Sequence, residues 1–305
     1  MMEKVLITGG TGTIGKELLK HFYKEWEIYV LSRDELKQAQ LKALYPDVHF
    51  IIGDIRDYQT VFRAMRGIET VIHAAAMKRI EVCEVNHIEA VKTNILGTEN
   101  VVFAAKERGI KKLISISTDK GVEPVNVYGM TKAIQEKVVI AEGYNCVRYG
   151  NVFGSRGSVI PLFIEQAKNK QPLTVTDPEM TRFILTTEEA IKLIVFALNS
   201  SMEGKVFVKK SPAAKIGDIA EVFKEKYNLS IKIIGKMVGE KEHEMLISHE
   251  ETTRLKDLGE YFEISPIPLS LPYGVPYTSE TTSRLSKKEI SKLLDDYLKQ
   301  NNLTI

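Results

Sequence analysis

Little in this sequence favours nucleic acid or a membrane as a partner. Its 305 residues include 42 Lys and Arg and 40 Asp and Glu, and the resulting net charge of +2 creates no strong field of either sign. No basic run longer than a Lys pair stands beside an aromatic cluster, which argues against nucleic acid. No apolar stretch approaches the roughly 18 residues of a membrane span.

Cysteine and metal-ligand patterns are also scarce. The two cysteines, Cys83 and Cys146, lie in unrelated contexts, so we expect reduced thiols rather than a disulfide or a metal pair. The six His residues show no metal-ligand spacing, and no metal site is predicted. The first residues lead directly into a strand-like segment, with no basic, apolar and small-residue leader pattern, which predicts a cytoplasmic protein.

Short apolar segments alternate with helical patterns up to about residue 150. The predicted strands are Lys4–Thr8, Ile28–Leu31, Val48–Ile52, Thr70–His73, Lys112–Ile116 and Asn145–Arg148. The predicted helices between them are Ile14–Tyr23, Asp34–Leu44, Tyr58–Met65, Ile88–Arg108 and Tyr128–Ala141. Near-continuous apolar strands separated by helices are typical of a Rossmann-like, doubly wound parallel sheet in an α/β protein.

The rhythm changes after residue 150. Helices are predicted at Val159–Lys168, Thr187–Leu198, Ile216–Tyr227 and Lys287–Lys299, the last with Ser286 as its N-cap. We therefore expect a nucleotide-binding, catalytic domain over 1–150 and a smaller substrate-binding lobe over 151–305, packed on the first, with some elements returning to it.

A glycine-rich segment, Gly9-Gly10-Thr11-Gly12-Thr13-Ile14-Gly15, joins the first predicted strand to the first helix. Glycine at 9, 12 and 15 permits a tight turn, a close approach of the backbone to a pyrophosphate and close helix–strand packing. The helix N-terminus then offers N–H groups to the anion. An ordinary glycine-rich turn is the alternative, but the strand before it and the helix after it favour dinucleotide binding.

The end of the second predicted strand bears on the choice of cofactor. Ser32, Arg33 and Lys37 suit the 2′-phosphate of NADP better than an acidic residue there would, so NADP is expected in preference to NAD. Arg33 as a solvated cation and Asp34 as a helix cap are the alternatives. Asp54 either accepts from adenine or caps the next helix. The further predicted cofactor-binding residues are Ile55, Ala74, Ala75, Ala76, Lys78, Thr93, Tyr128, Lys132 and Val152.

An acid, an amine and a phenol follow the fifth predicted strand. Thr118-Asp119-Lys120 is succeeded by Tyr128 and Lys132, and Tyr128 is the only Tyr with Lys four residues later. That spacing places both side chains on one helical face, where the Lys132 ammonium can lower the pKa of the phenol. A phenolate can then take a proton from a sugar hydroxyl. A surface turn with a screened Asp119–Lys120 pair is the alternative.

These motifs resemble the extended short-chain dehydrogenase/reductase superfamily, and within it the inverting UDP-N-acetylglucosamine 4,6-dehydratases of the pseudaminic acid pathway. The segments that carry the resemblance are Ser117-Thr118-Asp119-Lys120-Gly121, Pro124 to Lys132, Arg148 to Ser158, Thr176 to Phe183 and Gly239-Glu240-Lys241. A sister group that also epimerises carbon 3 has Met in place of Tyr128.

The resemblance implies catalytic roles for Thr118, Asp119, Lys120, Tyr128 and Lys132. Tyr128 takes the 4-hydroxyl proton while hydride leaves carbon 4, an uncharged Lys120 removes the proton on carbon 5, and a protonated Asp119 gives its proton to the departing 6-hydroxyl. The product is UDP-2-acetamido-2,6-dideoxy-β-L-arabino-hex-4-ulose, for pseudaminic acid or surface polysaccharide, and NADP is recycled in each turnover.

Substrate contacts are implied for Lys78, Asn151, Val159, Arg182 and Glu240, with UDP-N-acetylglucosamine or a related UDP-sugar as ligand. The chain departs from the family at Met237, where Arg is usual. Relatives also imply a homo-oligomer, a dimer or a hexamer. Two alternatives remain open: a nucleotide-sugar 4-epimerase or a 4,6-dehydratase of another hexose, and a non-catalytic NADP(H)-sensing protein.

Overall fold

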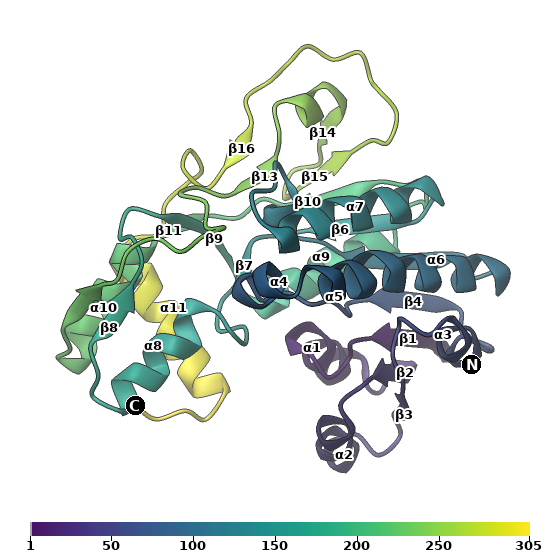
Figure 1. Ribbon diagram of the computed structural model, residues 1–305, viewed down its shortest axis with the longest axis horizontal. Helices are drawn as coiled ribbons and strands as arrows, with labels where there is room; N and C mark the ends of the chain where they lie inside the picture. Colours follow the sequence, from purple (N-terminus) through teal and green to yellow (C-terminus); the bar gives the residue numbers. More distant parts are fainter. Residues whose placement is uncertain (1) are drawn as a thin grey trace.

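The structure, a computed structural model, describes residues 2–305 and has a large sheet with helices on both faces (Figure 1). In this part of the chain the main sheet has nine strands, in the order β14-β15-β10-β6-β5-β4-β1-β2-β3. The neighbours from β3 to β10 are parallel, whereas β15 is antiparallel to β10 and β14. The predicted Rossmann-like α/β fold is confirmed, with an antiparallel edge.

All six strands predicted before residue 150 belong to this sheet. The strands of the main sheet are β1 (Glu3–Thr8), β2 (Trp26–Ser32), β3 (His49–Ile52), β4 (Thr70–His73), β5 (Lys112–Ile116), β6 (Asn145–Arg148), β10 (Val206–Lys209), β14 (Leu255–Asp257) and β15 (Tyr261–Ile264). The main helices beside it are α1 (Thr13–Phe22), α2 (Glu35–Leu44), α3 (Tyr58–Ala64), α6 (Gly97–Glu107), α7 (Val127–Ala141) and α9 (Thr187–Leu198).

The central strands are apolar throughout because both of their faces are covered. Along β1, Leu6 packs into a core shared with α3, α6 and α7, whereas Val5 and Ile7 pack into a core shared with α1, α2 and α9. All three side chains are fully buried. Each such side chain contributes about 1.5–3 kcal/mol through burial.

The strand order reverses between β1 and β4. From β1 the chain continues to β2 and β3 on one side, and then crosses to β4 on the other. In open α/β sheets such a reversal leaves a crevice at the carboxyl ends of the strands, where ligands bind.

The second half contributes to two bodies. The elements that return to the main sheet are α9, β10, β14 and β15. A smaller lobe, at the left of Figure 1, gathers α8 (Val159–Lys168), α10 (Ile216–Tyr227) and α11 (Lys287–Gln300) around Phe163 and Phe223. Its strands are β7 (Asn151–Val152), β8 (Leu173–Val175), β9 (Thr181–Leu185), β11 (Ala213–Lys215) and β12 (Ile231–Ile233), and the pair β13 (Met245–Ile247) and β16 (Tyr277–Thr278) lies near β9.

The prediction of one continuous helix over 88–108 is wrong. The segment 88–108 is not a single α-helix but α5 (His87–Val91), a π-helical turn (Lys92–Leu96) and α6. The Asn94 side chain in this turn is fully buried and bonds to Met77 and Thr131, a tertiary arrangement that helical periodicity does not reveal. A short helix, α4 (Ile80–Val85), was not predicted. Among residues 2–305, no helix combines the length and apolar character needed to span a bilayer.

Candidate active site

The loop from β1 to α1 leaves no room for larger side chains. Gly9 has φ +68°, and a Cβ there would lie 2.7 Å from the Cα of Ala75; one on Gly15 would lie 2.3 Å from the Cα of Gly10. Gly12 is the N-cap of α1, and neither a side-chain cap nor an acidic residue occupies the first turn. The first N–H groups of α1 are therefore available to an anion, which fits the pyrophosphate of a dinucleotide.

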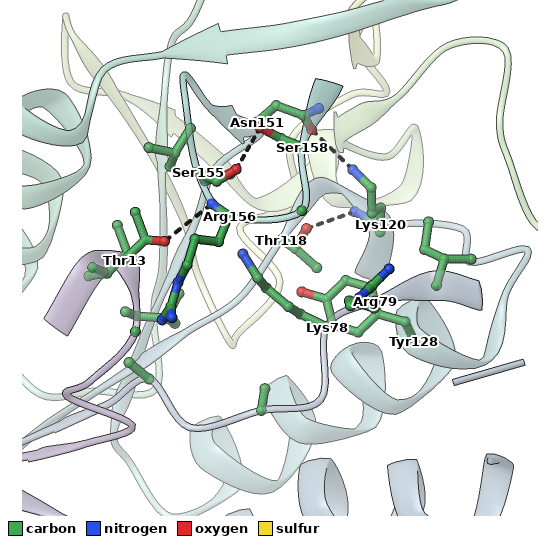
Figure 2. A pocket seen from close by; sticks show the side chains of 18 of the residues that line it. Thr13, Lys78, Arg79, Thr118, Lys120, Tyr128, Asn151, Ser155, Arg156 and Ser158 are labelled. Carbon is green, nitrogen blue, oxygen red and sulfur yellow. Dashed lines mark hydrogen bonds between the residues drawn. The ribbon is translucent and has the colours of Figure 1, made fainter. Parts of the chain in front are cut away.

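A cavity of about 1030 Å³ extends from this loop, across the ends of the strands, to the smaller lobe (Figure 2). Every predicted site residue except Asp119 lines it. The lining residues among those predicted are Gly9, Thr11, Gly12, Thr13, Ile14, Gly15, Ser32, Arg33, Asp34, Lys37, Asp54, Ile55, Ala74, Ala75, Ala76, Lys78, Thr93, Thr118, Lys120, Tyr128, Lys132, Asn151, Val152, Val159, Arg182 and Glu240. Asp119 lies directly behind this wall, with no exposed surface.

Of the residues that follow β2, Asp34 has a structural role, whereas Arg33 lies at the cavity rim. Asp34 caps α2 by accepting from the backbone N–H of Lys37, as the alternative interpretation of this residue predicts. Its carboxylate also pairs with the Lys37 ammonium. Arg33 is half-exposed at the cavity rim, with its guanidinium 3.7 Å from Asp54. β2 ends at Ser32 without an acidic residue, and Arg33 and Lys37 line this end of the cavity.

Asp54 does not cap the following helix. Asp57 is the N-cap of α3 and accepts from the backbone N–H of Gln59, whereas Asp54 accepts three hydrogen bonds from Arg56. Burial opposes ionisation of Asp54, but its hydrogen bonds with Arg56 outweigh that effect and lower its pKa. The alternative that made Asp54 a cap is therefore wrong, and its carboxylate remains at the cavity wall.

The loop after β4 is fixed from beneath. The side chain of Asn94 accepts from the N–H of Met77 at 2.8 Å and donates to the carbonyl of Met77 at 2.9 Å, so it holds backbone beside the cavity. Lys78 projects into the cavity (Figure 2), and burial together with the charges of Arg156 and Lys120 lowers its pKa. The buried hydroxyl of Thr93 has no partner within residues 2–305 and is available to a ligand.

The carboxylate of Asp119 is buried beside the Lys120 amine. Both belong to a short 3₁₀ turn, Asp119–Gly121, whose N-cap is Thr118. Asp119 Oδ1 accepts from Thr118 Oγ1 at 2.9 Å and from Lys120 Nζ at 3.0 Å. Its other oxygen, Oδ2, is buried and has no partner in the described part of the chain. The alternative of a solvated surface pair is therefore wrong.

Lys120 also contacts the second half of the chain. Its Nζ donates to Asn151 Oδ1 at 3.2 Å and lies 3.2 Å from Glu244 Oε1. Burial opposes the charge on Lys120, but Asp119 and Glu244 outweigh that effect and raise its pKa. The free site thus favours an ammonium rather than the expected uncharged amine. Burial raises the pKa of Asp119; Lys120 opposes this shift and Glu244 adds to it.

Glu244 is a site residue that sequence reasoning missed. It is 2% exposed, lines the cavity, and its Oε1 lies 3.8 Å from Arg182 Nε. Burial acts to raise the pKa of Glu244, but the charges of Lys120, Arg182 and Lys241 lower it overall. Nothing in the sequence pairs it with Lys120. The Gly239-Glu240-Lys241 segment nearby is the only local signal.

Tyr128 and Lys132 lie on the cavity side of α7, as their spacing predicts. Lys132 nevertheless donates to the Ile116 carbonyl at 2.6 Å and to Gln135 Oε1 at 2.5 Å, and burial lowers its pKa to about 8. Burial raises the pKa of Tyr128 to about 12, while Lys120 and the Thr118 hydroxyl act to lower it. The cation that favours the phenolate in this arrangement is therefore Lys120.

Apart from Lys78, the predicted substrate residues face the cavity from the second half of the chain. Arg182, on β9, is 7% exposed, and its Nη1 donates to the carbonyls of Thr181 at 2.8 Å and Glu242 at 3.1 Å. These bonds fix the guanidinium plane, which suits a diphosphate. Glu240 accepts from the N–H of Met237 at 3.0 Å, so its carboxylate closes its own loop.

Arg156 is a second residue that sequence reasoning did not single out. Its Nη2 donates to the carbonyl of Thr11 at 2.8 Å, and its backbone N–H reaches Thr13 Oγ1 at 3.5 Å (Figure 2). The loop that opens the smaller lobe is thereby tied to the loop that fits the pyrophosphate.

Comparisons with known proteins agree with this geometry. The family described as "Polysaccharide biosynthesis protein" matches residues 5–266. A protein named UDP-glucose 4-epimerase from Rickettsia akari is 40% identical, over 95% of this chain and 94% of its own length. The protein of the same name from Rickettsia prowazekii is also 40% identical, with the same coverage.

Solved structures show the same fold. The X-ray structure of Pen from Bacillus thuringiensis superposes with a TM-score of 0.91 at 39% identity, covering 96% of this chain and 98% of that one. DesIV from Streptomyces venezuelae, a dTDP-glucose 4,6-dehydratase with NAD and TYD bound, gives a TM-score of 0.74 at 19% identity, covering 98% of each chain. At that identity the likeness concerns the fold alone.

Proposed function

Because this chain belongs to the polysaccharide biosynthesis protein family, among nucleotide-sugar epimerases and dehydratases, we propose that it is an NADP-dependent UDP-N-acetylglucosamine 4,6-dehydratase that inverts carbon 5. The observation that carries the proposal is the burial of Asp119 against Lys120, at the wall of the cavity that Tyr128 also lines. Removal of water from a hexose needs an acid to protonate the departing hydroxyl and a base to remove a carbon-bound proton, and a buried acid–amine pair can supply both.

The proposal assigns the dinucleotide to the strand-end side of the cavity. The glycine loop and the N-terminus of α1 would hold its pyrophosphate, and Arg33 with Lys37 the 2′-phosphate that distinguishes NADP. When bound, the dinucleotide would supply a hydride acceptor for carbon 4 of the sugar and a hydride donor for carbon 6. Tyr128 takes the proton of the 4-hydroxyl at its phenolic oxygen; burial opposes the ionised form of this group, and Lys120 and Thr118 favour it.

Asp119 and Lys120 serve the elimination. Protonated Asp119 gives its proton to the 6-hydroxyl, which departs as water, and Lys120 takes the proton from carbon 5. Lys120 must first give up its own proton. Because Asp119 already holds a proton, the acceptor in reach is the Glu244 carboxylate, whose Oε1 lies 3.2 Å from Lys120 Nζ. Return of a proton to the opposite face of carbon 5 inverts that centre.

The proposed substrate is held from the smaller lobe. Arg182 would pair with the diphosphate, while Asn151, Val159 and Glu240 line the same end of the cavity. The homo-oligomer, a dimer or a hexamer, is part of the proposal. Exposed apolar side chains at Ile88, Phe103 and Ile134 support it, and light scattering tests it.

Mass spectrometry of the sugar nucleotide tests the dehydration. Purified protein supplied with UDP-N-acetylglucosamine and NADP⁺ should convert it to a product lighter by one water. A panel of UDP- and dTDP-hexoses defines the substrate. Recovery of UDP-N-acetylglucosamine with unchanged mass, at all enzyme concentrations, rejects the proposal.

A nucleotide-sugar 4-epimerase is the second candidate, because relatives at 40% identity carry the name UDP-glucose 4-epimerase. Epimerisation at carbon 4 uses Tyr128 but has no use for an acid and an amine beside carbon 6. Incubation with UDP-glucose, followed by separation from UDP-galactose, tests this candidate directly.

A further inference from the structure

Lys120 lies between two buried carboxylates from opposite halves of the chain. Its Nζ is 3.0 Å from Asp119 Oδ1 and 3.2 Å from Glu244 Oε1. Asp119 has no exposed surface and Glu244 is 2% exposed. One oxygen of each carboxylate, Asp119 Oδ2 and Glu244 Oε2, is buried without a hydrogen-bond partner among residues 2–305.

Two carboxylates that share one ammonium in a buried site cannot both remain ionised without a large cost in free energy. One of them therefore tends to hold a proton. The surroundings decide which one, since a second cation, Arg182, lies 3.8 Å from Glu244. Asp119 has no second cation in an ion pair within the described residues, and the Thr118 hydroxyl is its other close polar neighbour. The anionic form thus belongs on Glu244.

We propose that Glu244 is a positioning residue for the elimination: its carboxylate pairs with the Lys120 ammonium and thereby keeps the proton on Asp119. The assignment rests on the proposed dehydratase function and deepens it. An Asp next to a Lys would otherwise form a simple ion pair, which leaves no proton on the acid for the departing hydroxyl.

The directions of the two pKa shifts agree with this geometry. The pKa of Asp119 is raised by burial and by Glu244, whereas the pKa of Glu244 is lowered by Lys120, Arg182 and Lys241 against the effect of burial. Two neighbouring carboxylates whose pKa values move apart are the usual signature of an acid and an anion that divide their tasks.

The backbone holds Glu244 in place. Its N–H donates to Ser279 Oγ at 2.8 Å, and the N–H of Ser279 donates to the carbonyl of Glu244 at 2.8 Å. The residue directly precedes β13, in a segment that runs beside β9. Glu242, two residues earlier, directs its half-exposed carboxylate to Lys236 and serves as a matched control.

The first test reads the proton on Asp119 without turnover. The infrared difference spectrum between the native protein and Asp119→Asn at neutral pH should contain the carbonyl stretch of a protonated carboxylic acid. In the Glu244→Gln background the same Asp119→Asn difference should lose this band, because Lys120 then has Asp119 as its only carboxylate partner. In the Glu242→Gln background the band should persist. A band that persists in Glu244→Gln overturns the assignment.

The second test separates the two chemical stages in one turnover with UDP-N-acetylglucosamine. Glu244→Gln should release water about a hundredfold more slowly while it still reduces the nicotinamide, so the absorbance of the reduced cofactor should accumulate. Glu242→Gln should match the native protein. Equal losses of reduction and dehydration, in a variant with native thermal stability, overturn the assignment.

The outcomes also separate this assignment from the proposed function. If the native protein releases no water but the infrared band responds as expected, the dehydratase proposal fails and the Glu244–Lys120–Asp119 relationship stands. If the native protein dehydrates and the band ignores Glu244, only the assignment fails. Should Glu244→Gln not fold, Glu244→Asp replaces it: this variant must retain the band, and its loss overturns the assignment.

Discussion

Lys120 Nζ donates a hydrogen bond to Asp119 Oδ1 over 3.0 Å, inside the protein and at the edge of the main cavity. The side chains of an adjacent Asp and Lys usually point apart or into water, where a charged pair contributes little to stability. Here the turn at Asp119–Gly121 turns both inward, toward the place where Tyr128 would meet a sugar hydroxyl.

Asp119→Asn should slow dehydration by about 10²- to 10⁴-fold, because the amide cannot give a proton to the departing hydroxyl. Oxidation at carbon 4 does not use this group, so reduced nicotinamide should build up in a single turnover, as absorbance will show. Asp257→Asn, which changes an exposed partner of Lys210, is the control. Native dehydration by Asp119→Asn would contradict the acid's role.

Lys120→Met distinguishes the two enzyme candidates. A dehydratase should lose water release, by about 10²-fold or more, because no base remains for the proton on carbon 5. A 4-epimerase should lose less and regain its interconversion of UDP-glucose and UDP-galactose as pH rises, because Lys120 would serve there only to favour the ionised form of Tyr128. Chromatography measures both reactions. Lys210→Met, at a lysine that does not line the cavity, controls for loss of a lysine. Intact dehydration would remove Lys120 from the mechanism.

Tyr128→Phe should abolish both nicotinamide reduction and dehydration, since the 4-hydroxyl then has no proton acceptor. Calorimetric titration with UDP-N-acetylglucosamine should still give an affinity near the native one, because the ring remains and only the hydroxyl is lost. Retained reduction in this variant would mean that another group takes the proton. Tyr273→Phe, at an exposed tyrosine, is the matched control.

Arg33→Ala should weaken NADP⁺ binding by about 10- to 100-fold, the equivalent of one charge-assisted hydrogen bond, and leave NAD⁺ binding nearly unchanged. Titration of the apo-protein with each dinucleotide measures both affinities. Arg66→Ala, at an exposed position outside the cavity lining, should change neither. Equal losses for the two dinucleotides would argue against 2′-phosphate recognition.

His73 should make the free energy of unfolding depend on pH. It is fully buried between Thr8 and Thr98, and burial lowers its pKa to about 3. The unfolded chain, with a pKa near 6.5, binds this proton first, so stability should fall by up to about 1.4 kcal/mol per pH unit as pH drops from about 6.5 toward 3. Urea titrations of native protein and His73→Asn should show the shallower dependence in the variant.

The first half of the fold follows from local patterns, because its central strands are buried on both faces. Thr70–His73, Lys112–Ile116 and Asn145–Arg148 agree at both ends with the predicted strands. The helix expected over 88–108 is interrupted by a π-helical turn. The side chain of Asn94 in this turn bonds to Met77, a tertiary contact that the periodicity of apolar residues does not reveal.

In the site, too, the residues of local motifs could be predicted from the sequence, whereas residues that act through tertiary contacts could not. Contiguous motifs contribute many of the residues that line one cavity, among them Gly9, Gly12 and Gly15 and, from the second motif, Thr118, Lys120, Tyr128 and Lys132. Glu244 and Arg156 act through contacts with distant segments, so the sequence contains no spacing that would reveal them. The expectation of an uncharged Lys120 is wrong for the same reason, because the charge of Glu244 helps to raise the pKa of Lys120.

Turnover in heavy water tests the central claim most directly. We predict that UDP-N-acetylglucosamine loses one water, gains a single deuteron at carbon 5, and shows by NMR the inverted configuration at that carbon. A product of unchanged mass without deuterium at carbon 5, whether the starting sugar or its 4-epimer, would contradict a mechanism in which Asp119 and Lys120 act on the hexose.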